Sequence, residues 1–280
     1  MSPEPEKALI RVRRTFKGTA WESIQHPEDR MALDALKRIP MLDQVIAFII
    51  KHGWERVLYV ENISSSVKVT PRQFPRVWYL FMEANRIFGI DDPCEIYVTQ
   101  QPMLNAYTYG NEKPFIMLSS AAVDGFTDDQ LLAVIGHEIG HVLSGHCLYT
   151  TMAVLISPIL EMGLRNFPGG GIAINALRMG LFRWLRASEL TGDRFGLLAC
   201  QDPQTMVQVM MKLAGGAVDE QHDYMEFLAQ AAAYKELDND LLDNLYKLLQ
   251  TTYRTHPLAV VRASEIMTWA QSRTYQNMMS

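Results

Sequence analysis

The stretch from residue 131 to residue 143 constrains the fold most, because it sets ionisable side chains among apolar ones. Leucine, valine and isoleucine residues at 131, 132, 134, 135, 139, 142 and 143 predict a buried helix. The same helix carries His137, Glu138 and His141. Polar groups of this kind are costly to bury without partners. The sequence therefore predicts a core helix whose three polar side chains share a partner, rather than two histidines on a polar surface helix.

A metal ion is the partner that this spacing favours. His137 and His141 are four residues apart, so their imidazoles lie one turn apart on one helix face and can bind the same Zn²⁺. Glu138 lies beside His137 and can take a proton from a water that the metal polarises. We predict a site with one Zn²⁺ per chain, with Glu138 as the general base that activates water for attack on a peptide bond.

Catalytic zinc needs a third protein ligand and one open position. A histidine six residues after His141 would serve, but Cys147 stands there. His146 lies about 140° away from His141 around a continuous helix, and we expect it to be a capping or surface residue. The third ligand is therefore expected from another part of the chain.

Glu189 and Asp193 are better candidates than Cys147 or His146 for completing the metal site. They lie four residues apart on a second expected helix and so share one face. Glu189 can bind zinc, while Asp193 accepts the outer N–H of a ligand histidine and fixes its tautomer. The alternative is that both acids pair with Arg186 and Arg194 on a solvated face; the histidine pair upstream favours the metal interpretation.

The remaining periodicity predicts an α+β chain that is mostly α. Strands are expected at 95–99, 104–109 and 115–118, forming a small antiparallel sheet. Helices are expected near 28–51, 71–88, 127–143, 172–199, 238–253 and 255–272, with another that begins at Asp202-Pro203. We divide the chain into an N-terminal helical segment, 1–60, and a zinc metallopeptidase domain, 61–280.

Composition excludes some partners. The net charge of −5 gives no basic field for nucleic acid, so none is expected to bind. Three widely spaced cysteines do not predict a disulfide framework, and the acidic N-terminus does not resemble a signal peptide, so we expect a cytoplasmic location.

The apolar region 142–177 is expected to continue the core helix; peripheral contact with a membrane is the alternative.

Four motifs together resemble a known family. His137-Glu138-Ile139-Gly140-His141, the pair Glu189 and Asp193, Asn105-Ala106-Tyr107 and Thr255-His256-Pro257 are similar to motifs of the Ste24-type CAAX prenyl protease and HtpX-like peptidase family, of the gluzincin class. The resemblance spans residues 60–272 and keeps the order of the motifs. It implies a zincin-like metallopeptidase fold with the small sheet beside an active-site helix and a second ligand helix.

The resemblance also implies roles for single residues. His137, His141 and Glu189 would bind zinc, Glu138 would be the general base, and Asp193 would support a ligand histidine. His256 would stabilise the oxyanion of the tetrahedral intermediate, supported by Arg262. Asn105, Ala106 and Tyr107 would lie on an edge strand that binds an extended polypeptide substrate.

Two other functions stay open at this point. One is a chaperone-like or peptide-binding module on a metallopeptidase scaffold, with weak or regulated activity. The other is a metal hydrolase of non-peptide substrates. The intact set of His137, Glu138, His141 and Glu189 favours the peptidase.

Overall fold

The computed structural model describes residues 12–39, 42, 46, 53–110, 112–153, 170–217, 221–236 and 258–280. Helices lie at α1 Pro27–Lys37, α3 Trp54–Ser65, α4 Pro75–Phe88, α5 Ser120–Gly125, α6 Asp128–Leu143, α8 Gly170–Cys200, α9 Pro203–Gly215, α10 Tyr224–Glu236, α12 Ala259–Ala270 and α13 Arg273–Met279. The strands are β1 Val67–Lys68, β2 Glu95–Thr99, β3 Ala106–Tyr109 and β4 Phe115–Ser119. The predicted α+β, mostly α class is confirmed. The expected boundary at residue 60 falls within α3 and stays a prediction.

The sheet departs from the expected antiparallel arrangement. Its strand order is β1-β2-β4-β3, and the central pair β2 and β4 is parallel, with Glu95 opposite Phe115. β1 and β3 run antiparallel to their neighbours, so the sheet is mixed. After β2 the chain leaves one strand position open and forms β3 beyond it. β4 then fills this position, between β2 and β3. Among the described residues β3 pairs with β4 alone, which makes it an edge strand.

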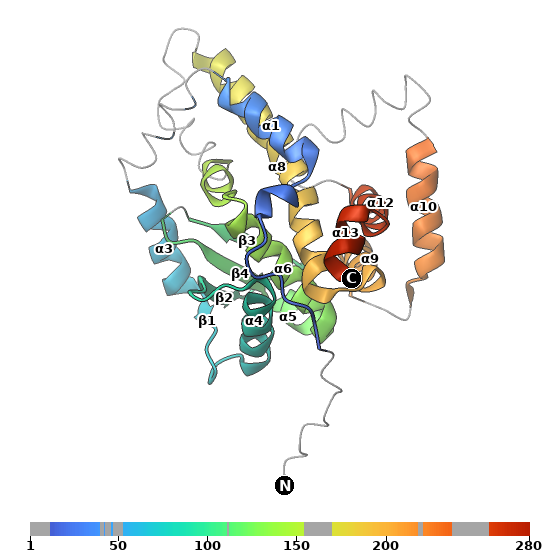
Figure 1. The fold of residues 1–280 in the computed structure, drawn as a ribbon. Coiled ribbons are helices and arrows are strands. Elements are labelled where there is room, and N and C mark those ends of the chain that lie inside the picture. Colours follow the sequence, from blue (N-terminus) through green and yellow to red (C-terminus); the bar gives the residue numbers. More distant parts are fainter. Residues whose placement is uncertain are drawn as a thin grey trace.

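α6 runs through the main core between the sheet, α4, α8 and α9 (Figure 1). Its start, predicted near residue 127, is set by a capping box, in which Thr127 accepts from the backbone N–H of Gln130 and the Gln130 side chain accepts from that of Thr127. α4 ends where expected, at Gly89, whose φ of 70° suits glycine. The start of α6 and the end of α4 are thus set by residues that lie close to them in the sequence.

Small residues bring α6 close to α8. A Cβ added to Gly136 would lie 2.3 Å from the Cβ of Ala199, and one added to Gly140 would lie 2.6 Å from the Cβ of Phe195. Atoms cannot pack at such distances, so glycine is required for this close approach. The close approach lets side chains of both helices reach one point.

The apolar stretch after α6 is not the continuous helix that was expected. α6 ends at Leu143, and Gly145 turns the chain with a φ of 70°. A new helix, Cys147–Ala153, leaves at 97° to α6. Within the described ranges, no single helix passes the length and hydropathy test for a membrane span, whereas this bent pair does so when its two helices are taken together.

α1 packs along the first part of α8 (Figure 1). The two helices and residues 152 and 153 share a second apolar cluster, which is separate from the main core. Its buried members are Ala32, Leu36, Leu42, Met152, Ala153, Leu177, Leu181, Trp184, Leu185 and Ala187. A segment near the N-terminus is thereby fixed against the helix that carries Glu189.

Candidate metal centre

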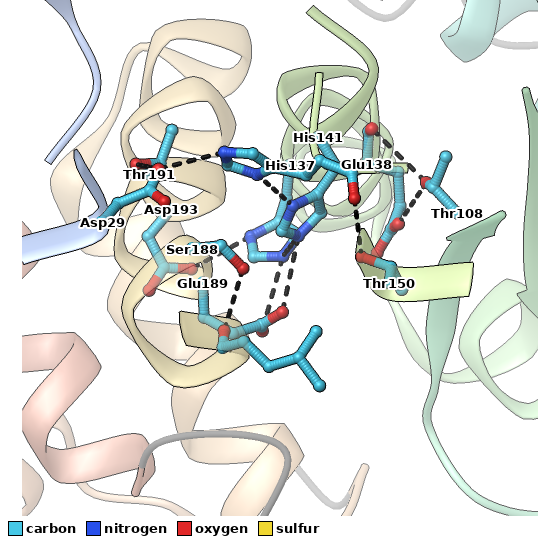
Figure 2. Close-up of polar contacts among 12 residues, drawn as sticks. Asp29, Thr108, His137, Glu138, His141, Thr150, Ser188, Glu189, Thr191 and Asp193 are labelled. Carbon is cyan, nitrogen blue, oxygen red and sulfur yellow. Dashed lines mark hydrogen bonds and ion pairs between the residues drawn. The ribbon is translucent and has the colours of Figure 1, made fainter. Parts of the chain in front are cut away.

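The three predicted ligands converge between α6 and α8. His137 and His141 come from α6 and Glu189 from α8, and all three are buried (Figure 2). Nε2 of His137 lies 3.1 Å from Nε2 of His141 and 3.6 Å from Oε2 of Glu189, and Nε2 of His141 lies 3.4 Å from Oε1 of Glu189. Ligands at about 2.1 Å from a tetrahedral zinc are about 3.4 Å apart. The residues fit a tetrahedral metal with one position left open.

Asp193 holds the outer side of His137, as its spacing predicts. Its Oδ1 lies 3.1 Å from Nδ1 of His137, which leaves Nε2 of that ring facing Glu189. Arg262 of α12 donates two hydrogen bonds to the same carboxylate, at 2.9 and 2.6 Å, and its Nη1 lies 3.3 Å from Glu189. Burial raises the pKa of Asp193, but Arg262 and His137 more than offset this effect and lower it.

The buried charges call for a cation. Glu138, Glu189 and Asp193 carry three formal negative charges, and Arg262 carries one positive charge. These carboxylates outnumber the one arginine, and this excess of negative charge favours a bound cation. Burial lowers the pKa of His137, but the negative charges of Glu189 and Asp193 raise it to about 10.

Glu138 lies beside the ligands and is oriented by β3. The hydroxyl of Thr108 donates a hydrogen bond of 2.6 Å to Oε2 of Glu138 (Figure 2). Both residues are buried, so the contact fixes the carboxylate rather than leaving it mobile in solvent. No sequence pattern identified Thr108; only the packing of β3 on α6 shows its contact.

The expectation that His146 is a surface residue is wrong, whereas it does stand in the capping position, with its carbonyl accepting the N–H of Thr150 at the start of the helix Cys147–Ala153. Its ring is buried, with Nδ1 2.9 Å from Nδ1 of His141 and Nε2 3.0 Å from Oδ2 of Asp29. The error came from extending α6 beyond residue 143: the turn at Gly145 brings His146 back towards His141. Burial lowers the pKa of His146, which favours the neutral ring. The glycine two residues before Cys147 was the available signal, but nothing local indicates Asp29.

A cleft of about 870 Å³ opens over the ligands. Its lining includes the ligands, Glu138, Arg262 and the whole of β3 with the preceding residue Asn105. Asn105 is fixed by the backbone, because its N–H donates to the hydroxyl of Ser119 and its carbonyl accepts from the Ser119 N–H. His256 lies outside the described residues.

Two histidines and a glutamate on packed helices, beside the carboxylate of Glu138 and an edge strand, fit a metallopeptidase centre. The model for Peptidase family M48 matches residues 71–270. The chain belongs to Peptidase family M48, which confirms the HtpX-like resemblance and shows a metal-dependent peptidase.

The names of two similar proteins are consistent with this family. The chain is 36% identical over 269 residues to the plastoglobule-localized metallopeptidase 48, chloroplastic, of Arabidopsis thaliana, covering 94% of this chain and 77% of the relative. It is 30% identical over 150 residues to Protease HtpX of Shewanella halifaxensis, covering 50% of this chain and 52% of that protein. The chain thus spans about half the length of the HtpX protein.

Proposed function

We propose that this chain is a zinc-dependent endopeptidase in which His137, His141 and Glu189 bind the metal. The observation that carries the proposal is the convergence of their three donor atoms, all within 4.8 Å of one another, at the base of the cleft. Nitrogen and carboxylate donors in this number suit catalytic zinc. The excess of buried carboxylates over Arg262 also favours a cation at this place.

Glu138 is the proposed general base. A bound Zn²⁺ would supply Lewis acidity, lowering the pKa of a water at the open position and polarising the substrate carbonyl. The Glu138 carboxylate accepts the proton of that water and passes it to the leaving amine. Thr108 holds Oε2 of Glu138, and the other carboxylate oxygen is the proposed acceptor of that proton.

The proposed substrate is an extended polypeptide that pairs with β3. The free edge of β3 lines the cleft, and an added strand there would lie along the metal ligands. Asn105, Ala106 and Tyr107 would supply backbone groups for this pairing. Apolar residues such as Leu104, Phe126, Met206 and Met210 also line the cleft, which favours an apolar substrate side chain.

The family resemblance supports two further assignments. His256 is proposed to stabilise the oxyanion of the tetrahedral intermediate. Arg262 is proposed to support it from the buried centre, where it contacts Asp193 and Glu189. The plastoglobule location of the plant relative supports contact of this chain with a lipid surface, with 142–177 as the proposed region; the cytoplasmic location stays a prediction.

Hydrolysis of casein and of a peptide library by the zinc-loaded full chain tests the function. We expect internal cleavage, identified by mass spectrometry of the products, that stops with a chelator and returns with added zinc. Glu138→Gln is the matched control, since it keeps the shape of the side chain. Peptide binding without cleavage by the zinc-loaded chain would instead support the peptide-binding module.

A further inference from the structure

His141 and His137 are supported in different ways on the sides that face away from the metal. Nδ1 of His137 contacts the carboxylate of Asp193 directly. Nδ1 of His141 contacts Nδ1 of His146, and Nε2 of His146 contacts the carboxylate of Asp29. Each ligand histidine is thus joined to a buried carboxylate, His137 directly and His141 through the imidazole of His146.

The hydrogen bonds of this row have one consistent direction. An ionised carboxylate only accepts, so Nε2 of His146 donates to Asp29. Nδ1 of His146 lies 2.9 Å from Nδ1 of His141, and only one of these two nitrogens can carry the proton of that contact. A histidine that binds the proposed metal through Nε2 has its proton at Nδ1, so Nδ1 of His141 donates and Nδ1 of His146 accepts. His141 in turn has no proton at Nε2, the atom that faces Glu189. Asp29 thereby selects the tautomer that a metal ligand requires.

Three neighbouring side chains fix the position of the Asp29 carboxylate. Besides His146, Trp184 donates to its Oδ1 at 3.0 Å and Thr191 donates to its Oδ2 at 2.7 Å. Its side chain is buried, and both donors belong to α8, the helix of Glu189. The ring of His146 packs against Trp184 with centroids 5.4 Å apart. Carboxylate and imidazole therefore have one fixed arrangement.

The segment that carries Asp29 is itself tied to α8. The backbone N–H of His26, at the start of α1, donates to the Thr191 hydroxyl at 2.9 Å. Arg194 donates to the carbonyl of Ile24 at 2.9 Å. All of these N-terminal residues precede residue 71, where the match to the family model begins.

We propose that Asp29 is a positioning residue of the metal centre, acting through His146 to orient His141 for metal binding. The inference rests on the proposed zinc site. It makes the N-terminal segment a functional part of that site, although it precedes the residues matched by the family model. The opposing explanation is that Asp29 only anchors α1 to α8 through Trp184 and Thr191.

Zinc affinity of the purified full chain, measured by competition with a chromophoric chelator, tests the proposal. We expect Asp29→Asn to weaken zinc binding about 10- to 100-fold, as for other residues that support a metal ligand. Asp34→Asn is the matched control, because Asp34 is exposed on the same helix and should leave the affinity unchanged. The melting temperature of each metal-free variant is measured in parallel.

A double-mutant cycle separates positioning from anchoring. His146→Phe keeps the packing against Trp184 and breaks the row, so it should weaken zinc binding, and Asp29→Asn added to it should cause no further loss. If Asp29→Asn lowers the metal-free melting temperature while zinc affinity is unchanged, Asp29 is only an anchor and the proposal is wrong. Should Asp29→Asn not fold, unchanged zinc affinity of His146→Phe overturns the proposal and weakened affinity supports it. Failure of the wild-type chain to bind zinc would instead refute the proposed function.

Discussion

Asp193→Asn tests the buried ion pair and the metal centre in one substitution. The change keeps the side-chain volume but removes the charge and one of the two acceptor atoms. Arg262 donates to both carboxylate oxygens, and His137 lies 3.1 Å from Oδ1. One amide oxygen cannot serve all three donor atoms, and the amide NH₂ must face another donor.

Asp193→Asn is expected to lower both the stability of the metal-free protein and its affinity for zinc. Breaking a buried ion pair costs about 3–5 kcal/mol, and we take about 3 because Arg262 keeps Glu189 at 3.3 Å. For a chain of this size, that corresponds to roughly 6–12 °C in the melting temperature of the metal-free protein. Zinc affinity should fall about 10- to 100-fold, because the amide side chain no longer orients the ring of His137.

Chelator competition measures the zinc affinity, and circular dichroism measures metal-free unfolding. Asp202→Asn is the matched control: Asp202 caps α9 by accepting from the backbone N–H groups of Gln204 and Thr205, and asparagine caps about as well. Both quantities should match the wild-type values in that control. Zinc affinity of Asp193→Asn equal to that of the control would refute the positioning of His137 by Asp193.

Three further substitutions test the centre and its support. Glu138→Gln should lower the rate of peptide hydrolysis by about 10² to 10⁴ while the metal content stays at one zinc per chain; loss of zinc would point to a ligand instead. Glu189→Ala should greatly reduce the zinc retained after dialysis, and unchanged metal content would exclude it as the third ligand. Gly136→Leu should lower the free energy of unfolding by about 1–3 kcal/mol, because its side chain would overlap Ala199. Denaturant unfolding measures that loss, and an unchanged midpoint would mean that the two helices can separate without cost.

Local chemistry made part of the fold predictable. The capping box at Thr127, the glycine after α4 and the Asp202-Pro203 start of α9 each act within a few residues, and the three helix ends that they set were predicted from sequence. Three of the four described strands were predicted close to their true bounds, and β1 was not predicted. The strand order was not predicted either, because pairing depends on which strand lies between which others in space. The antiparallel expectation failed for that reason.

The candidate site likewise contains residues that could be predicted from sequence and residues that could not. His137, His141, Glu189 and Asp193 follow from helical spacing, and the structure brings them together. His146 was misplaced because the spacing rule was applied across a turn. Asp29 has no local signal at all, since its contacts with His146 and α8 depend on long-range packing.

The close approach of α6 and α8 at Gly136 has a thermodynamic consequence. Because the ligands come from both helices, a bound metal acts as a cross-link between segments that lie far apart in the chain. Separation of the helices and release of the metal are then linked equilibria. At a free zinc concentration 100 times the dissociation constant, this linkage raises the free energy of opening by about 2.7 kcal/mol. Metal supply would therefore regulate how often the core of this peptidase opens, as well as whether it can cleave a substrate.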